Sequence, residues 1–186
     1  MEKAEEELKM EKPKFLYHGS PHVDIEEFEP RISPGGEKYG ALVYASPDLA
    51  AASIFMLKTD RSWSASRFSF TGRYDVLCAI ITEPREDFIK HDVGGHIYVL
   101  PSDTFETDPN RGLKEKEWAS KVKVKPVQKL EFKSALDAVI ENGVQVYFVD
   151  SEIYEKMESS KDHGQEILKN LESENQKRGV NIKKLE

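Results

Sequence analysis

The sequence is poor in cysteine, in long apolar runs and in basic charge. Its 186 residues include one cysteine, Cys78, which excludes an internal disulfide, and no spacing of Cys and His resembles a zinc site. No apolar run approaches the roughly 20 residues of a membrane span. The first 14 residues are charged and lack the apolar core of a secretory signal. We therefore expect a cytoplasmic protein without a membrane segment or a bound metal.

Acidic residues outnumber basic ones, 34 to 27. Residues 15–150 carry 21 acids and 16 bases, so the expected folded part has a net charge of 21 − 16 = 5 negative charges. Broad, non-specific binding to nucleic acid needs a basic face, and this balance argues against it. A small local basic patch stays compatible with the sequence.

The charge and apolar patterns divide the chain into three zones. Residues 1–13 read as a charged tail or short helix, and residues 14–150 as the folded domain. In residues 151–186 apolar side chains recur at helical spacing. We expect this last zone to be a charged helical segment that packs loosely on the domain or is partly disordered, with a partner-binding helix as the alternative.

The middle zone has the pattern of an α+β domain. Short runs rich in Val, Ile and Tyr predict buried strands over 15–17, 41–45, 75–82, 95–100, 118–127 and 144–149. Long loops are often functional, and two are expected, over 29–39 and 101–114.

Two helices have clear boundary signals. Ser46-Pro47-Asp48 predicts an N-cap at Ser46 and a helix that runs to about Leu57. Ser134 and Asp137 resemble a capping box, and Asn142-Gly143 should end that second helix.

Three short motifs can carry chemistry. The first is His18-Gly19-Ser20 at the end of a predicted strand. A glycine beside an imidazole lets a flat ligand lie against the chain and pair with its N–H and C=O groups. An ordinary strand end is the alternative interpretation.

The second motif is the strand that delivers Tyr44 just before an alanine-rich helix ending near Phe55. Small residues would let this helix lie close to the sheet, so Tyr44 and Phe55 can wall an aromatic ring. Core packing is the alternative for both side chains.

The third motif is Glu115-Lys116-Glu117-Trp118, which ends a polar loop and opens a strand. A carboxylate there can accept a hydrogen bond from a sugar hydroxyl and stabilise positive charge at an anomeric carbon. A solvated run of charges is the alternative. His91 and His96 flank Gly94-Gly95, but no third ligand is spaced for a metal.

In this order, the three motifs resemble the ADP-ribosyltransferase superfamily, in particular the His-Tyr-Glu branch that includes diphtheria toxin and the poly(ADP-ribose) polymerases. The resemblance covers roughly residues 15–132. It implies an ADP-ribosyltransferase-like fold, in which an NAD cleft lies between two small, mostly antiparallel sheets with few helices. It also implies a metal-independent enzyme that transfers ADP-ribose from NAD to an acceptor, a protein, a nucleic acid or a small molecule, and releases nicotinamide.

The resemblance also implies roles for single residues. His18 would bond the adenosine ribose, and the backbone of Gly19, next to Ser20, would hold the nicotinamide carboxamide. Tyr44 and Phe55 would stack on the nicotinamide, and Ser53 would lie near its amide. Glu117 would be the catalytic glutamate, with Glu115 as a weaker candidate for a second carboxylate.

One departure from the family pattern concerns Tyr44. Alignment on Ala45 would put Val43, rather than Tyr44, at the place of the stacking tyrosine. Two alternatives to the transferase stay open: a catalytically degenerate module that binds NAD, ADP-ribose or a protein, and an RNA 2′-phosphotransferase. The latter needs basic residues against phosphate, for which the sequence offers Arg31, Lys38 and Arg111.

Overall fold

The computed structural model describes residues 11–33, 37–58, 68–73, 76–108, 116–162 and 164–177. The chain divides into two compact units, each made of two separate segments. Unit 1 comprises residues 1–57 and 93–138, and unit 2 comprises residues 58–92 and 139–186. The expected domain over 14–150 is therefore shared between the two units, and the C-terminal zone belongs to unit 2.

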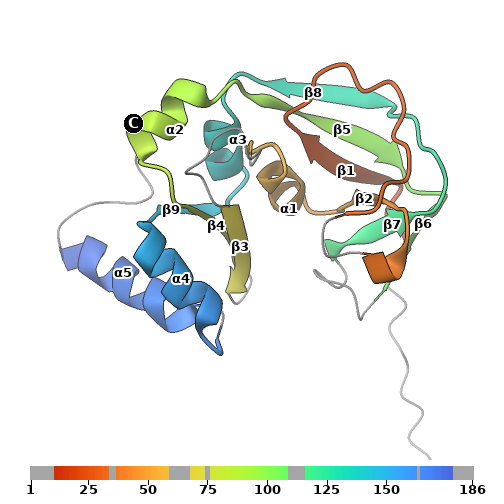
Figure 1. Cartoon of the computed structure of the whole chain (residues 1–186). Coiled ribbons are helices and arrows are strands. Elements are labelled where there is room, and N and C mark those ends of the chain that lie inside the picture. Colours follow the sequence, from red (N-terminus) through yellow and green to blue (C-terminus); the bar gives the residue numbers. More distant parts are fainter. Residues whose placement is uncertain are drawn as a thin grey trace, which may run out of the picture. The chain divides into compact units, whose positions relative to one another are not determined.

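Unit 1 contains two three-stranded antiparallel sheets. The first has the order β1-β5-β8, and its strands lie side by side in Figure 1; they are β1 (Phe15–Ser20), β5 (Gly95–Pro101) and β8 (Gln128–Phe132). The second has the order β2-β7-β6, with strands β2 (Val43–Ala45), β7 (Trp118–Ser120) and β6 (Phe105–Thr107). A paired bridge between Tyr17 and Ser46 joins the edge of the first sheet to the end of β2.

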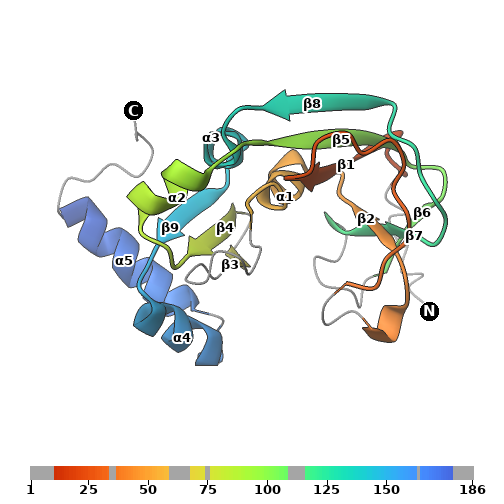
Figure 2. The same cartoon turned by 45° about the horizontal axis from the view of Figure 1, so that its top comes forward.

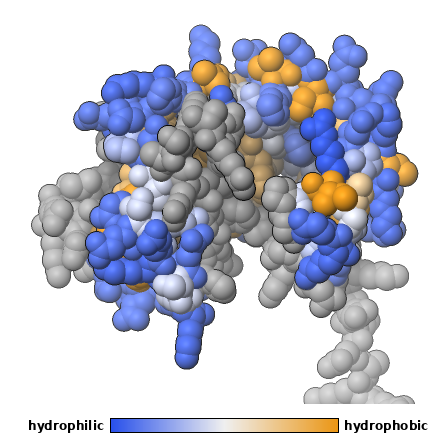
Figure 3. All heavy atoms as spheres, viewed as in Figure 1, coloured by the Kyte–Doolittle hydropathy of each residue, from blue (hydrophilic) through white to orange (hydrophobic). Residues whose placement is uncertain are grey.

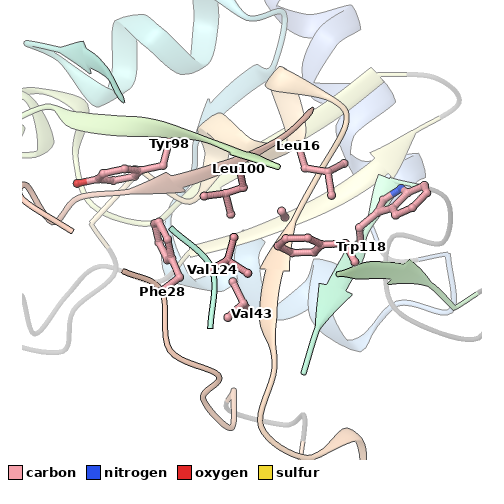
Figure 4. Packing of buried hydrophobic residues seen from close by; sticks show 9 residues of the cluster. Leu16, Phe28, Val43, Tyr98, Leu100, Trp118 and Val124 are labelled. Carbon is pink, nitrogen blue, oxygen red and sulfur yellow. The ribbon is translucent and has the colours of Figure 1, made fainter. Parts of the chain in front are cut away.

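A hydrophobic cluster connects these two sheets. Alternate residues of β1 and β5 supply Leu16, Tyr98 and Leu100, and alternate residues of β2 supply Val43 and Ala45. The remaining members are Phe28, Phe105, Trp118 and Val124. In Figure 4 the side chains of Leu100 and Val124 point toward one another. Alternate side chains of β5 and β2 thus face this cluster, while the other side chains of β5 are buried on its opposite face.

Helix α1 (Leu49–Ile54) lies against β1 in unit 1. The expected N-cap at Ser46 is wrong, because the side chain of Asp48 accepts the N–H of Ala50 at 2.9 Å and caps the helix. Ser46 instead accepts the N–H of Asp48 through its hydroxyl. The helix is also shorter than expected, since it ends at Ile54 rather than near Leu57.

Unit 2 has a mixed sheet. Its strands β3 (Phe68–Arg73) and β4 (Val76–Ile81) are antiparallel, and β9 (Gln145–Phe148) pairs with β4 in parallel. Its helices are α2 (Arg85–His91), α4 (Ser151–Ser159) and α5 (Gln165–Lys177), as Figure 2 shows. Helix α3 (Ala135–Glu141) contains the point in the sequence at which unit 1 ends and unit 2 continues. The hydroxyl of Ser134 accepts the N–H of Asp137, and Gly143, two residues after the helix, has a φ of +89°. Both boundary signals predicted from the sequence are confirmed.

The sequence predicts a helical segment over 151–186, and α4 and α5 lie there; the loose packing expected for it is wrong for these two helices, and residues 178–186 lie outside the described part of the chain. Tyr154 and Met157 of α4 and Leu168 of α5 are buried in one cluster with residues of β4 and β9. The turn between the two helices is tight: Gly164 has a φ of +80°, and a Cβ there would lie 2.8 Å from the Met157 side chain. The helical spacing of apolar residues in the sequence indicates the buried face of α4 and α5. How deeply that face is buried depends on β4 and β9, which lie far away in the sequence.

The expected strand over 118–127 is also too long, since β7 ends at Ser120. The hydroxyl of Ser120 accepts the N–H of Val122, two residues on, and such a local bond replaces a ladder bond. The loop expected over 101–114 contains β6, and the loop over 29–39 contains a short 3-10 helix, η1 (Glu37–Tyr39).

The coarse prediction of an α+β chain with few helices and small antiparallel sheets is confirmed. On the face drawn in Figure 3, hydrophilic residues cover most of the described surface, with small hydrophobic groups between them. None of the helices in the described residues is long and apolar enough to cross a membrane.

Candidate functional site

His18 is fixed at the junction of the two sheets of unit 1. Its ring Nδ1 lies 2.6 Å from the backbone carbonyl oxygen of Tyr44, 26 positions later in the chain. The other side of the imidazole meets Phe28, with 4.5 Å between ring centroids and a tilted geometry. Phe28 in turn makes an edge contact with Tyr98, the residue opposite His18 on β5. His18 is thus the point at which β1, β2 and the segment after β1 meet.

The carbonyl contact determines the proton arrangement of His18. A carbonyl only accepts hydrogen bonds, so Nδ1 must donate, and in a neutral imidazole Nε2 is then the acceptor. Burial lowers the pKa of His18 below 6.5; the bond to the Tyr44 carbonyl opposes this shift, and the positive charge of Arg31 adds to it. The ring is therefore mostly neutral at pH 7, and its Nε2 can accept a hydrogen bond from a hydroxyl group.

Tyr44 and Val43 lie on opposite faces of β2. Val43 is buried in the cluster between the sheets, whereas Tyr44 is half-buried and alternates away from it. The hydroxyl of Ser33 lies 3.5 Å from the hydroxyl of Tyr44. With Val43 and Ala45 in the core, Tyr44 is the β2 side chain that points away from the cluster between the sheets.

Glu117 immediately precedes β7 and is half-buried. In the β2–β7 ladder, Tyr44 pairs with Ala119, two positions after Glu117. Lys116, its neighbour, forms an ion pair of 3.0 Å with Asp48, the N-cap of α1. These contacts anchor both sides of Glu117, one to β2 and one to α1. Glu115, the second carboxylate candidate, lies outside the described residues.

Gly19 has a structural reason to be glycine. A Cβ at this position would lie 1.9 Å from the carbonyl oxygen of Ala52, because α1 packs directly on β1. Ser20 is buried, and its hydroxyl accepts the N–H of His22 at 3.1 Å. Close packing of α1 therefore accounts for Gly19, and the local bond to His22 accounts for Ser20. Neither residue needs a ligand to explain its type.

The two α1 candidates differ in exposure. Ser53 is fully buried, and its hydroxyl donates to the carbonyl of Ala50 at 2.8 Å, so helix packing accounts for it. Phe55, at the C-cap of α1, is 47% exposed. Phe55 is therefore not a core residue, and part of its ring surface faces solvent.

Three features of the site were not predicted from the sequence. They are the ring contact of Phe28 with His18, the contact of Ser33 with Tyr44, and the effect of the Arg31 charge on the pKa of His18. Phe28 is an isolated apolar residue among acids in the sequence, and its ring contact with His18 depends on a chain reversal that no local pattern specifies. Arg31 carried a weak signal as a cation in a long loop close to the His motif. No group of three or more His, Cys, Asp or Glu in the described part of the chain is placed to hold a metal ion.

Comparisons of the chain with protein-family models, with curated proteins and with solved structures give no match. The functional inference therefore depends on the contacts of His18, Tyr44 and Glu117.

Proposed function

We propose that this protein is an NAD-dependent ADP-ribosyltransferase that transfers a single ADP-ribose unit to an acceptor and releases nicotinamide. The observation that supports the proposal best is the adjacency of the three motif strands. β1 contacts β2 through the Tyr17–Ser46 bridge and the His18–Tyr44 bond, and β2 pairs with β7. Two small sheets in one unit also fit the split-sheet fold that the motifs imply.

His18 would bind the adenosine ribose of NAD. With Nδ1 donating to the Tyr44 carbonyl, Nε2 accepts the proton of a ribose hydroxyl. A charged imidazolium would lack this acceptor, so the lowered pKa keeps the side chain in the form that the contact needs.

The nicotinamide ring would stack between Tyr44 and Phe55. Aromatic pairs of this kind contribute about 0.5–1.5 kcal/mol beyond the area that they bury. Phe55, which is 47% exposed, would lose solvent contact when the ring binds.

Glu117 would stabilise the reacting ribose. The bond from the ribose anomeric carbon to the nicotinamide nitrogen breaks, and nicotinamide leaves with both electrons as a neutral molecule. The ribosyl group then has oxocarbenium character, which the carboxylate stabilises electrostatically through the ribose 2′-hydroxyl. An acceptor oxygen or nitrogen, or water, attacks the anomeric carbon and gives up its proton.

The test is the release of nicotinamide from NAD by the full chain, compared with the variant Glu117→Gln. We expect this variant to fold and to bind NAD, and to release nicotinamide more slowly by on the order of 100-fold, since one electrostatic group is lost. Glu106→Gln, an exposed carboxylate on β6 in the same sheet, is the matched control and should keep the normal rate.

An unchanged rate in Glu117→Gln would refute the role of this carboxylate. Saturable NAD binding with no nicotinamide release from the unaltered chain would instead favour a module that binds the dinucleotide without catalysis.

A further inference from the structure

Arg31 is held in place by a two-sided backbone bridge beside β2. The N–H of Arg31 donates to the carbonyl of Leu42, and the N–H of Leu42 donates back to the carbonyl of Arg31, both at 3.0 Å. Residues 31–33 thus run antiparallel to the approach to β2. The backbone of Arg31 is therefore held by the residue that precedes β2, Leu42.

The same segment contacts the side chain of Tyr44 and acts electrostatically on His18, the two residues assigned to the ends of NAD. Ser33 places its hydroxyl 3.5 Å from the Tyr44 hydroxyl. The charge of Arg31 lies close enough to His18 to disfavour protonation of that imidazole. The backbone geometry gives the same neighbourhood: Arg31 pairs with Leu42, two residues before Tyr44, and the carbonyl of Tyr44 is bonded to His18.

The guanidinium group of Arg31 has a weak electrostatic partner, Glu29, whose pKa is lowered mainly by Lys123 and to a smaller extent by Arg31. Arg31 is exposed, and within the described part of the chain no carboxylate forms an ion pair with it. Glu29, two residues earlier, is bonded to Lys123 instead. The donors of Arg31 can therefore still bind an anion that enters this site.

We propose that Arg31 binds the pyrophosphate of NAD and of ADP-ribose, an inference that rests on the proposed function. The pyrophosphate joins the two riboses, so it has to pass between the group bound at His18 and the group bound at Tyr44. A guanidinium group presents a planar set of donors that matches phosphate oxygens in a bidentate arrangement. Arg31 would therefore select pyrophosphate-containing nucleotides over uncharged nucleosides at the same site.

The experiment is a calorimetric titration of the full chain and of Arg31→Gln with NAD, ADP-ribose and adenosine. We expect Arg31→Gln to weaken NAD and ADP-ribose by about 10- to 100-fold, the scale of a lost charged hydrogen bond, and to leave adenosine within about two-fold. Arg31→Lys should recover part of the affinity, because it keeps the charge without the planar fork. Lys125→Gln, an exposed cation in the same unit, is the control and should bind like the unaltered chain.

The salt dependence gives a second readout. Raising ionic strength should weaken NAD binding to the unaltered chain more steeply than to Arg31→Gln, because one charge contact is screened. A thermal unfolding profile for each variant verifies that the fold is kept.

The outcomes separate the two proposals. Equal NAD affinity in folded Arg31→Gln and in the unaltered chain would overturn the role of Arg31 while leaving the NAD site intact. An equal loss for adenosine would also overturn it, because the arginine would then shape the site rather than contact phosphate. Failure of the unaltered chain to bind NAD and ADP-ribose would overturn the proposed function and this inference together.

Discussion

Gly19 gives the sharpest test of how α1 and β1 are held together. In Gly19→Ala the new Cβ would lie 1.9 Å from the carbonyl oxygen of Ala52 and 2.9 Å from its carbonyl carbon. An ordinary contact is about 3.4 Å, so the backbone of α1 would have to move by about 1.5 Å. Both groups are backbone, and Ala51, Ala52 and Ile54 are buried, so no flexible side chain can absorb the change.

We expect Gly19→Ala to lower the free energy of unfolding by about 3 kcal/mol, the upper part of the range for overpacked cores. For a chain of this length, that corresponds to a fall in Tm of about 6–12 °C. Urea unfolding followed by circular dichroism measures the global change. Hydrogen exchange at the amides of α1 shows whether the loss is centred on this helix.

Gly40→Ala is the matched control. Nothing lies within 4 Å of a Cβ at Gly40, so the cost there is that of a left-handed φ of +76°, about 1 kcal/mol. A Gly19→Ala variant as stable as the unaltered chain, or more stable than Gly40→Ala, would refute the packing argument. A Gly19→Ala variant that is fully stable but fails to bind NAD would mean that Gly19 is needed for the ligand and not for the packing of α1.

Two further predictions concern His18 and the C-terminal helices. The folded pKa of His18 lies below 6.5, so the unfolded chain binds the proton first. The contribution of His18 to the free energy of unfolding should be fully present above pH 6.5 and be lost as the pH falls toward the lowered pKa. Urea unfolding from pH 5 to 7.5 measures this slope, which His18→Gln should reduce and His22→Gln, at an exposed position, should not; equal slopes would contradict the neutral assignment. Leu168→Ala should cost about 2–5 kcal/mol, because this side chain of α5 is fully buried, whereas Ile89→Ala, at a 46% exposed position in the same unit, should cost much less. Similar denaturation midpoints for these two variants would mean that α5 contributes little to the core.

Local patterns predicted the elements whose signals lie within a few residues. A short run rich in Val, Ile and Tyr predicted β5 closely, and the Ser134 cap with Gly143 bounded α3, because strand composition and capping act over short distances. The N-cap of α1 was misplaced, since Ser46 and Asp48 are both capable acceptors. Asp48 is the residue that bonds the first turn, and Lys116, distant in sequence, pairs with it.

Features that depend on distant contacts could not be predicted. The interleaving of two units, each built from separate segments, follows from strand pairing such as β4 with β9, across more than 60 residues. The ring contact of Phe28 with His18 and the position of Arg31 likewise depend on how the segment after β1 turns back. The motif residues His18 and Tyr44 were identified from short patterns, but the bond between them is a tertiary feature.

The most direct test of the central claim is a calorimetric titration of the full chain with NAD, repeated with Tyr44→Ala. Our account predicts saturable binding to the unaltered chain and clearly weaker binding to the variant, because the nicotinamide loses one stacking surface. An absence of binding at millimolar NAD, or equal affinity in the two proteins, would contradict a nicotinamide site at Tyr44.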